Sequence, residues 1–137
     1  RYVTPENALE ALEEITAEAE VVLDALGLTY RVLRLAGGDL GFSAEMTYDI
    51  EVWSPGVEQW LEVSSCSSFS DFQARRANLR FRSGENQKPR FVHTLNGSAV
   101  ALPRLLVSLL ETYQKADGTI EVPEAIRDRL GFSNISP

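Results

Sequence analysis

The chain has 137 residues, with 20 acidic residues against 13 lysines and arginines, so its formal net charge at neutral pH is −7. The length fits one domain, and 44% hydrophobic with 24% charged residues is typical of a globular protein. No apolar run reaches the about 18 residues that cross a bilayer, and a single cysteine excludes an internal disulfide. We therefore expect no membrane partner and a cytoplasmic location. The first residue is Arg1 and the only methionine is Met46, so we expect the chain to be part of a longer protein.

The first predicted element is a helix that starts at Thr4 and ends at Gly27. Threonine can cap the first backbone N–H groups, and Pro5 fits the first turn. Glycine suits a helix end because it adopts the left-handed conformation at low cost. Apolar residues recur at intervals of three and four, as on a helix that covers a core: Ala8, Leu12, Ile15, Ala19, Val22 and Leu26. Seven acidic residues fall within residues 1–28, and we expect them to face solvent.

The middle of the chain predicts a sheet. The segments with strand composition or alternating polarity are residues 28–36, 48–53, 60–64, 75–82 and 91–95. Short turns join them with no helix between, which favours antiparallel pairing.

The last third returns to helical spacing. Residues 98–114 predict a helix, residues 118–122 a short strand, and residues 123–131 a final helical piece that ends at a glycine. The expected buried stripe of the first of these helices is Leu102, Leu105, Leu106, Leu109 and Leu110. The predicted fold class is therefore α+β, with one antiparallel β-sheet flanked by helices.

Three carboxylates are expected on the sheet. Asp49 and Glu51 share one face of their strand, and Glu62 lies on the next strand. If the strands pair, these groups approach one another, and a few carboxylates together with phosphate oxygens suit Mg²⁺. The alternative is a solvated acidic face, which the spacing alone favours.

Nucleophilic catalysis has weak support. Cys66 lies among four serines, but His93 is the only histidine and no acid–base arrangement accompanies the serines. We interpret Cys66 as a small buried residue and His93 as a hydrogen-bonded structural residue.

A basic segment interrupts the acidic chain. Residues 75–90 contain six lysines and arginines and one acid. Read as a strand, the segment places Arg76, Asn78, Arg80 and Arg82 on one polar face. Such a row of guanidinium groups could bind phosphate or pair with neighbouring acidic strands, and periodicity does not separate these two readings.

A strand leads directly into a helix at residues 93–104. The small residues after Asn96 would allow a ligand close to the backbone, and a helix N-terminus attracts anions. Arg104 is positioned to reach an anion or to stack on a flat ring. The alternative, a tightly packed junction with a surface arginine, is equally open from this segment alone.

Longer motifs are more specific. The sequences EVSSCS at residues 62–67, DFQARRAN at 71–78 and HTLNGS at 93–98 resemble the seryl-tRNA synthetase family in order and spacing. YDIEVW at residues 48–53 and DGTIEVP at 117–123 also match. The resemblance covers nearly the whole chain.

The resemblance implies a class II aminoacyl-tRNA synthetase catalytic fold. Members activate L-serine with ATP and Mg²⁺ to seryl-adenylate and transfer it to tRNA(Ser), as homodimers when full length. By resemblance, ATP would contact Glu62, Val63, Ser64, Ser65 and Arg104. Glu62 and Arg104 would be the catalytic residues, Glu62 and Ser65 would ligate Mg²⁺, and Asn96 with Ser98 would contact serine.

The resemblance also implies that residues 1–137 form the C-terminal part of the catalytic domain, with motif 3 and the sheet before it. In the family, motif 1, the motif 2 loop and the N-terminal tRNA-binding arm lie upstream of this stretch. We therefore expect the isolated chain to be inactive. The alternative is a non-catalytic binding module or paralogue derived from a synthetase, which docks a protein or RNA partner.

Overall fold

The computed structural model describes residues 1–137, which form one five-stranded sheet, two two-stranded sheets and several helices. The helical elements are η1 (Pro5–Asn7), α1 (Ala8–Ala25), α2 (Phe72–Ala77), α3 (Leu102–Tyr113) and α4 (Glu124–Leu130). The strands are β1 (Tyr2–Val3), β2 (Tyr30–Arg34), β3 (Met46–Ser54), β4 (Gln59–Ser68), β5 (Arg80–Phe81), β6 (Arg90–Phe91), β7 (His93–Gly97), β8 (Ile120–Glu121) and β9 (Asn134–Ile135).

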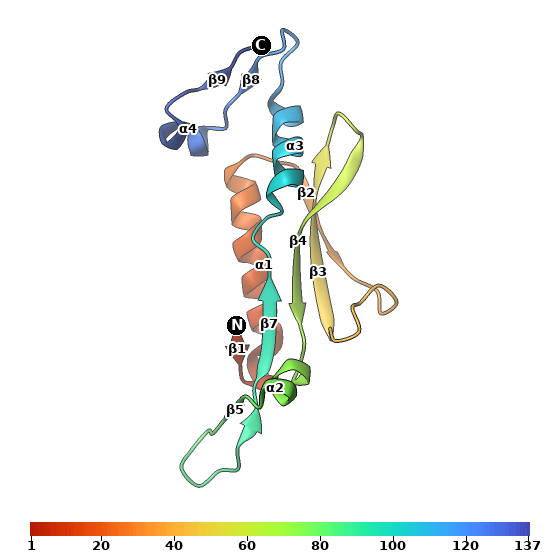
Figure 1. Ribbon diagram of the computed structural model, residues 1–137, viewed down its shortest axis with the longest axis vertical. Helices are drawn as coiled ribbons and strands as arrows, with labels where there is room; N and C mark the ends of the chain where they lie inside the picture. The colour runs from red at the N-terminus through yellow and green to blue at the C-terminus, as the bar shows by residue number, and fades with distance from the viewer.

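The main sheet has the strand order β1-β7-β4-β3-β2, and every neighbouring pair is antiparallel. Strands β2, β3 and β4 follow one another along the chain, as expected for strands joined by turns. Strand β7 then returns beside β4, and β1 pairs with its other edge (Figure 1). The predicted α+β class with an antiparallel sheet is confirmed.

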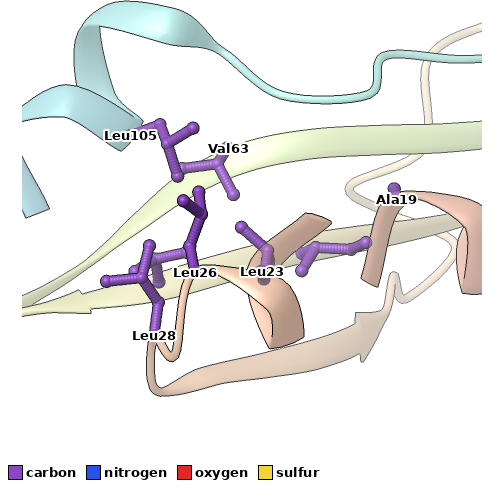
Figure 2. Packing of buried hydrophobic residues seen from close by; sticks show 8 residues of the cluster. Ala19, Leu23, Leu26, Leu28, Val63 and Leu105 are labelled. Atoms are coloured by element: carbon purple, nitrogen blue, oxygen red, sulfur yellow. The ribbon is translucent and has the colours of Figure 1, made fainter. Parts of the chain in front are cut away.

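Helices α1 and α3 cover the same face of this sheet. Their side chains meet in one apolar cluster that joins both helices to β3 and β4. Figure 2 shows the buried residues of the cluster, where Leu23 of α1, Val63 of β4 and Leu105 of α3 converge. Leu23 and Val63 are almost completely buried. Burying one such side chain stabilises the folded protein by about 1.5–3 kcal/mol.

Helix α1 forms as its sequence predicts. Of its apolar stripe, Ala8, Leu12, Ala19 and Leu26 are buried. Gly27 follows with φ 65°, the left-handed conformation expected after a helix end. The start differs in detail: a 3-10 turn precedes the helix, and Thr4 contributes its backbone carbonyl rather than a side-chain cap.

The predicted strand over residues 75–82 is wrong. Residues 72–77 form helix α2, and only Arg80 and Phe81 are extended. Alanine and arginine are good helix formers, Arg75 pairs with Asp71 one turn earlier, and Asn78 ends the helix in the left-handed conformation. The single polar face expected for the arginines of this segment therefore does not form.

The buried stripe of α3 also differs from the prediction. Leu105 is buried, but Leu102 and Leu106 are 70% and 55% exposed. The helix starts at Leu102, and its inward stripe passes through Leu105 and Ser108, whose hydroxyl donates to the Arg104 carbonyl. A serine hydroxyl that is hydrogen-bonded within its own helix can be buried in a core. A prediction based only on apolar residues therefore missed Ser108.

Two parts extend from the main body (Figure 1). We call residues 80–91 the β5–β6 arm; its residues 82–90 are all exposed. The other part contains β8, α4 and β9, where the predicted short strand and final helix are confirmed. None of the helices combines the length and apolarity needed to cross a lipid bilayer.

Candidate functional site

The main sheet has an inner face, covered by α1 and α3, and an outer face turned away from them. Ile50 and Val52 point inward, so their neighbours on β3 point outward. A 2.7 Å contact between the Thr47 and Ser67 hydroxyl oxygens joins β3 to β4 on the outer face. By register, the outer face carries Arg31, Thr47, Asp49, Glu51, Glu62, Ser65, Ser67 and Asn96.

A bulge in β4 places two of the candidate residues together. Glu62 and Ser65 are three residues apart, and regular alternation would place them on opposite faces. The β3–β4 register shifts at this point, so that Val63 has no opposite residue. Glu62 then lies opposite Glu51, and Ser65 lies opposite Asp49. Both candidate residues therefore share the outer face.

The residues of the bulge itself point inward. Val63 and Ser64 are 1% and 2% exposed. Their backbone and side chains secure the segment that follows β7: Val63 accepts a bond from the Ala101 N–H, and the Ser64 hydroxyl donates to the Ser98 carbonyl. The Ser98 N–H donates in turn to the Ser65 carbonyl at 3.3 Å. A ligand on the outer face would meet only the backbone of the two buried residues.

Arg104 lies in the first turn of α3 and returns to β4. Its Nη1 donates to the Glu62 backbone carbonyl at 2.7 Å and lies 3.8 Å from the Glu62 Oε1 atom. Both side chains are about half exposed, at 54% and 49%. The arrangement presents a guanidinium and a carboxylate side by side, a pair able to meet an anion and a cation of one ligand.

Asn96 and Ser98 lie at the end of β7. Asn96 is opposite Ser67 in register, and both Asn96 and Ser98 are exposed. They help to line a hollow of about 360 Å³ together with Arg1 and with Ile15 and Glu18 of α1, so this space lies on the α1 side of β7 and does not include Glu62 or Ser65. The two residues expected to contact a small substrate thus border the same space.

The sheet carboxylates do not gather into a preformed metal site. Glu51 pairs with Arg31 at 2.6 Å, and Glu62 has Arg104 beside it. No group of three or more acidic, histidine or cysteine residues is placed to hold a metal ion. One oxygen is exceptional: Asp49 Oδ1 is buried and has no hydrogen-bond partner. A metal at this face would need carboxylate, hydroxyl and ligand oxygens, and the free oxygen of Asp49 belongs to the residue opposite the Ser65 hydroxyl.

Cys66 and His93 behave as structural residues. Cys66 is completely buried, as predicted, with its Sγ 3.9 Å from the Ile15 carbonyl. His93 Nε2 lies 3.3 Å from the Ser70 hydroxyl, but Nδ1 is buried without a partner. A catalytic serine–histidine pair needs a third group that orients the imidazole, and none is present.

The basic segment is partly neutralised. Arg75 pairs with Asp71 and Arg90 pairs with Glu6, so the acidic partners are not those of the sheet. The Arg75 hydrogen bond holds the pKa of the Asp71 carboxyl below its usual value. Arg75 also stacks on the ring of Phe91, 4.9 Å from its centre. Helix formation at residues 72–77 accounts for the Asp71–Arg75 pair, because residues four apart are neighbours on a helix and not on a strand.

Comparison with known proteins gives a consistent result. Residues 1–113 match the family model described as the tRNA synthetase class II core domain (G, H, P, S and T). A serine–tRNA ligase of Gemmatimonas aurantiaca is 59% identical over 96% of this chain, and one of Moorella thermoacetica is 54% identical over 100% of it. The chain spans 31% and 32% of the length of these two relatives.

Two solved structures have the same fold. A seryl-tRNA synthetase from Pyrococcus horikoshii complexed with ATP matches with a TM-score of 0.95 and 44% identity, over 99% of this chain and 30% of its own. A cytoplasmic serine–tRNA ligase from Naegleria fowleri in complex with AMP matches with a TM-score of 0.90 and 29% identity, over 98% of this chain and 33% of its own.

Proposed function

Because the chain belongs to the class II tRNA synthetase core-domain family, we propose that it forms the C-terminal part of the catalytic domain of a serine–tRNA ligase. The observation that carries the proposal is the position of Glu62, Ser65 and Arg104, which the β4 bulge and the start of α3 bring to one place. The two similar structures hold ATP and AMP, and a nucleotide is the ligand that this arrangement fits.

The proposed reaction has two steps. In the first, a carboxylate oxygen of L-serine attacks the α-phosphorus of ATP, and pyrophosphate leaves. In the second, a terminal ribose hydroxyl of tRNA(Ser) attacks the serine carbonyl carbon, and AMP leaves. Both steps depend on positioning and on stabilising the charge that develops at phosphate oxygens.

Each candidate residue has a role in this proposal. Arg104, tied to β4 through the Glu62 carbonyl, offers its remaining N–H groups to the nucleotide. The Glu62 carboxylate and Ser65 hydroxyl would hold Mg²⁺, which when bound neutralises phosphate charge. Asn96 and Ser98 would contact the serine substrate from the end of β7.

The nucleotide contact of Val63 and Ser64 is proposed to run through their backbone. Both side chains point into the core, so substitutions that keep the core packed should leave ATP binding intact. Side-chain recognition by these two residues would require a different strand geometry.

The complete protein is proposed to work in the cytoplasm as a homodimer. The chain spans about a third of the length of its curated relatives, so we propose that the isolated chain does not form seryl-adenylate.

A chimera tests the activity of this segment in a complete enzyme. In the chimera, this chain replaces the matching segment of the Gemmatimonas aurantiaca relative, and gel filtration checks whether the chimera is a dimer.

The decisive measurement is serine-dependent ATP–pyrophosphate exchange. The chimera should be active, and Glu62→Gln should lower kcat/KM by about 10²–10³-fold, the range seen when one charge-stabilising group is removed. Glu58→Gln is the matched control, because Glu58 is an exposed acid in the turn before β4. An inactive chimera, or equal rates for the two variants, would contradict the proposal and favour a non-catalytic binding module.

A further inference from the structure

Asp49 lies on β3 directly opposite Ser65. Two residues further along both strands, Thr47 and Ser67 touch through their hydroxyl groups. Residues two positions apart on one strand point to the same face, and directly opposite residues on paired strands are neighbours on that face. The side chains of Asp49 and Ser65 therefore lie together on the outer face. The sequence places Asp49 among three sheet carboxylates that could suit Mg²⁺, and the family resemblance assigns it no individual role.

The carboxylate of Asp49 differs from the other acids around the sheet. Its Oδ1 atom is buried and accepts no hydrogen bond. In contrast, Glu51 accepts from Arg31, Glu13 accepts from a tyrosine hydroxyl, and Glu111 accepts from a serine hydroxyl. A buried acceptor without a donor costs about 1–3 kcal/mol, and more when it is charged. In the structure, no group of the chain donates a hydrogen bond to this oxygen.

The Ser65 hydroxyl is the donor that lies nearest in the strand register. A hydroxyl has one O–H donor and two lone pairs. When a lone pair of Ser65 binds a divalent cation, the O–H becomes a stronger donor and needs an acceptor on the side away from the cation. Asp49 is the residue opposite Ser65 in the register, and its oxygen is free.

We infer that Asp49 is a positioning residue for the divalent cation of the nucleotide site, acting as the acceptor for the Ser65 hydroxyl. It also supplies negative charge, since the charge of Glu62 is partly balanced by Arg104. Carboxylates behind metal ligands typically fix the orientation of the ligand and raise its basicity. The inference rests on the proposed function, because the cation enters with the nucleotide.

The test measures cation dependence rather than turnover. In the chimera, thermal unfolding is followed at fixed ATP concentration while Mg²⁺ is titrated, and the midpoint of the ATP-dependent stabilisation is recorded. Asp49→Asn and Asp49→Ala should raise the Mg²⁺ concentration at the midpoint by about 10–100-fold. Glu58→Gln is the matched control, because Glu58 is an exposed acid in the turn before β4 and has no place in the proposed cation site, so its midpoint should not change.

Unfolding without ligand separates positioning from a structural role. Asp49→Asn should then be about as stable as the unsubstituted chimera, because the buried Oδ1 atom accepts no hydrogen bond that the substitution could remove. A loss of ligand-free stability in both Asp49 variants, or an unchanged Mg²⁺ midpoint, would overturn the inference. Absence of any Mg²⁺-dependent ATP stabilisation in the unsubstituted chimera would overturn the proposed function and this inference with it.

Discussion

The two faces of the main sheet are built from the same strands but differ in burial and polarity. On the inner face, Ile50 and Val52 are completely buried against α1 and α3. On the outer face, the alternate residues of β3 are Asp49 and Glu51. Strand alternation therefore separates the residues that hold the fold from those available for chemistry. Substitutions on the inner face should change stability, and most on the outer face should not.

The largest expected effect on stability is in the inner cluster. Leu23→Ala should lower the free energy of unfolding by about 2–5 kcal/mol, because it leaves a cavity where α1 meets the sheet. Val21→Ala is the control on the same helix, since Val21 is 64% exposed, and it should stay within about 0.5 kcal/mol. Urea unfolding measures both, and similar costs would remove the distinction between buried and exposed positions.

A smaller effect is expected at Gly97, where β7 approaches β4. A Cβ atom at this position would lie 2.6 Å from the Cys66 sulfur. Gly97→Ala should therefore cost about 1–3 kcal/mol through overpacking. The double variant Gly97→Ala, Cys66→Ala should recover part of that loss, because the sulfur is then absent. A strictly additive pair in urea unfolding would show that this contact is not the cause.

The inner face should also show a response to alkali. Burial, followed by the neighbouring Asp24 carboxylate, raises the pKa of Tyr30 to about 12. An unfolded tyrosine ionises near pH 10, so the phenol is favoured in the folded chain. Its contribution to stability is complete below pH 10 and is lost as the pH rises towards 12. Tyr30→Phe should flatten this part of a stability–pH curve, whereas an unaltered slope would assign the alkaline loss to other groups.

The smallest effect is expected on the outer face. Arg31 pairs with Glu51 and stacks on Trp60, but its side chain is 44% exposed. Arg31→Gln should lower the free energy of unfolding by about 0.2–1 kcal/mol, as for other exposed ion pairs. High salt should reduce the difference further. A cost comparable with that of Leu23→Ala would mean that the outer face also carries the fold.

Periodicity was sufficient for the elements with one uniform buried face. Helix α1 and strand β3 show the expected three-to-four and alternating patterns, and both form where predicted. The prediction fails at residues 75–82, where arginines alternate with apolar residues. That pattern fits one continuous strand, but it also fits the observed end of helix α2 followed by the short strand β5. The ion pair with Asp71 and the left-handed Asn78 decide between them. Neither contact is visible in a polarity pattern.

The candidate site was harder to derive from residues alone. Simple alternation assigns Glu62 and Ser65 to opposite faces, and only the bulge at Val63 unites them. The motif resemblance selected both residues without supplying that reason. Asp49 could be placed on a polar face from the sequence, but its unpaired oxygen depends on the packing around it.

The β5–β6 arm offers a practical consequence. Residues 82–90 are all exposed, and exposed loop tips tolerate insertion and modification better than packed segments. The only cysteine of the chain, Cys66, is completely buried. Asn86→Cys would therefore create a single reactive thiol at the tip of the arm. A fluorophore attached there would report on approaching macromolecules while leaving both faces of the sheet unmodified.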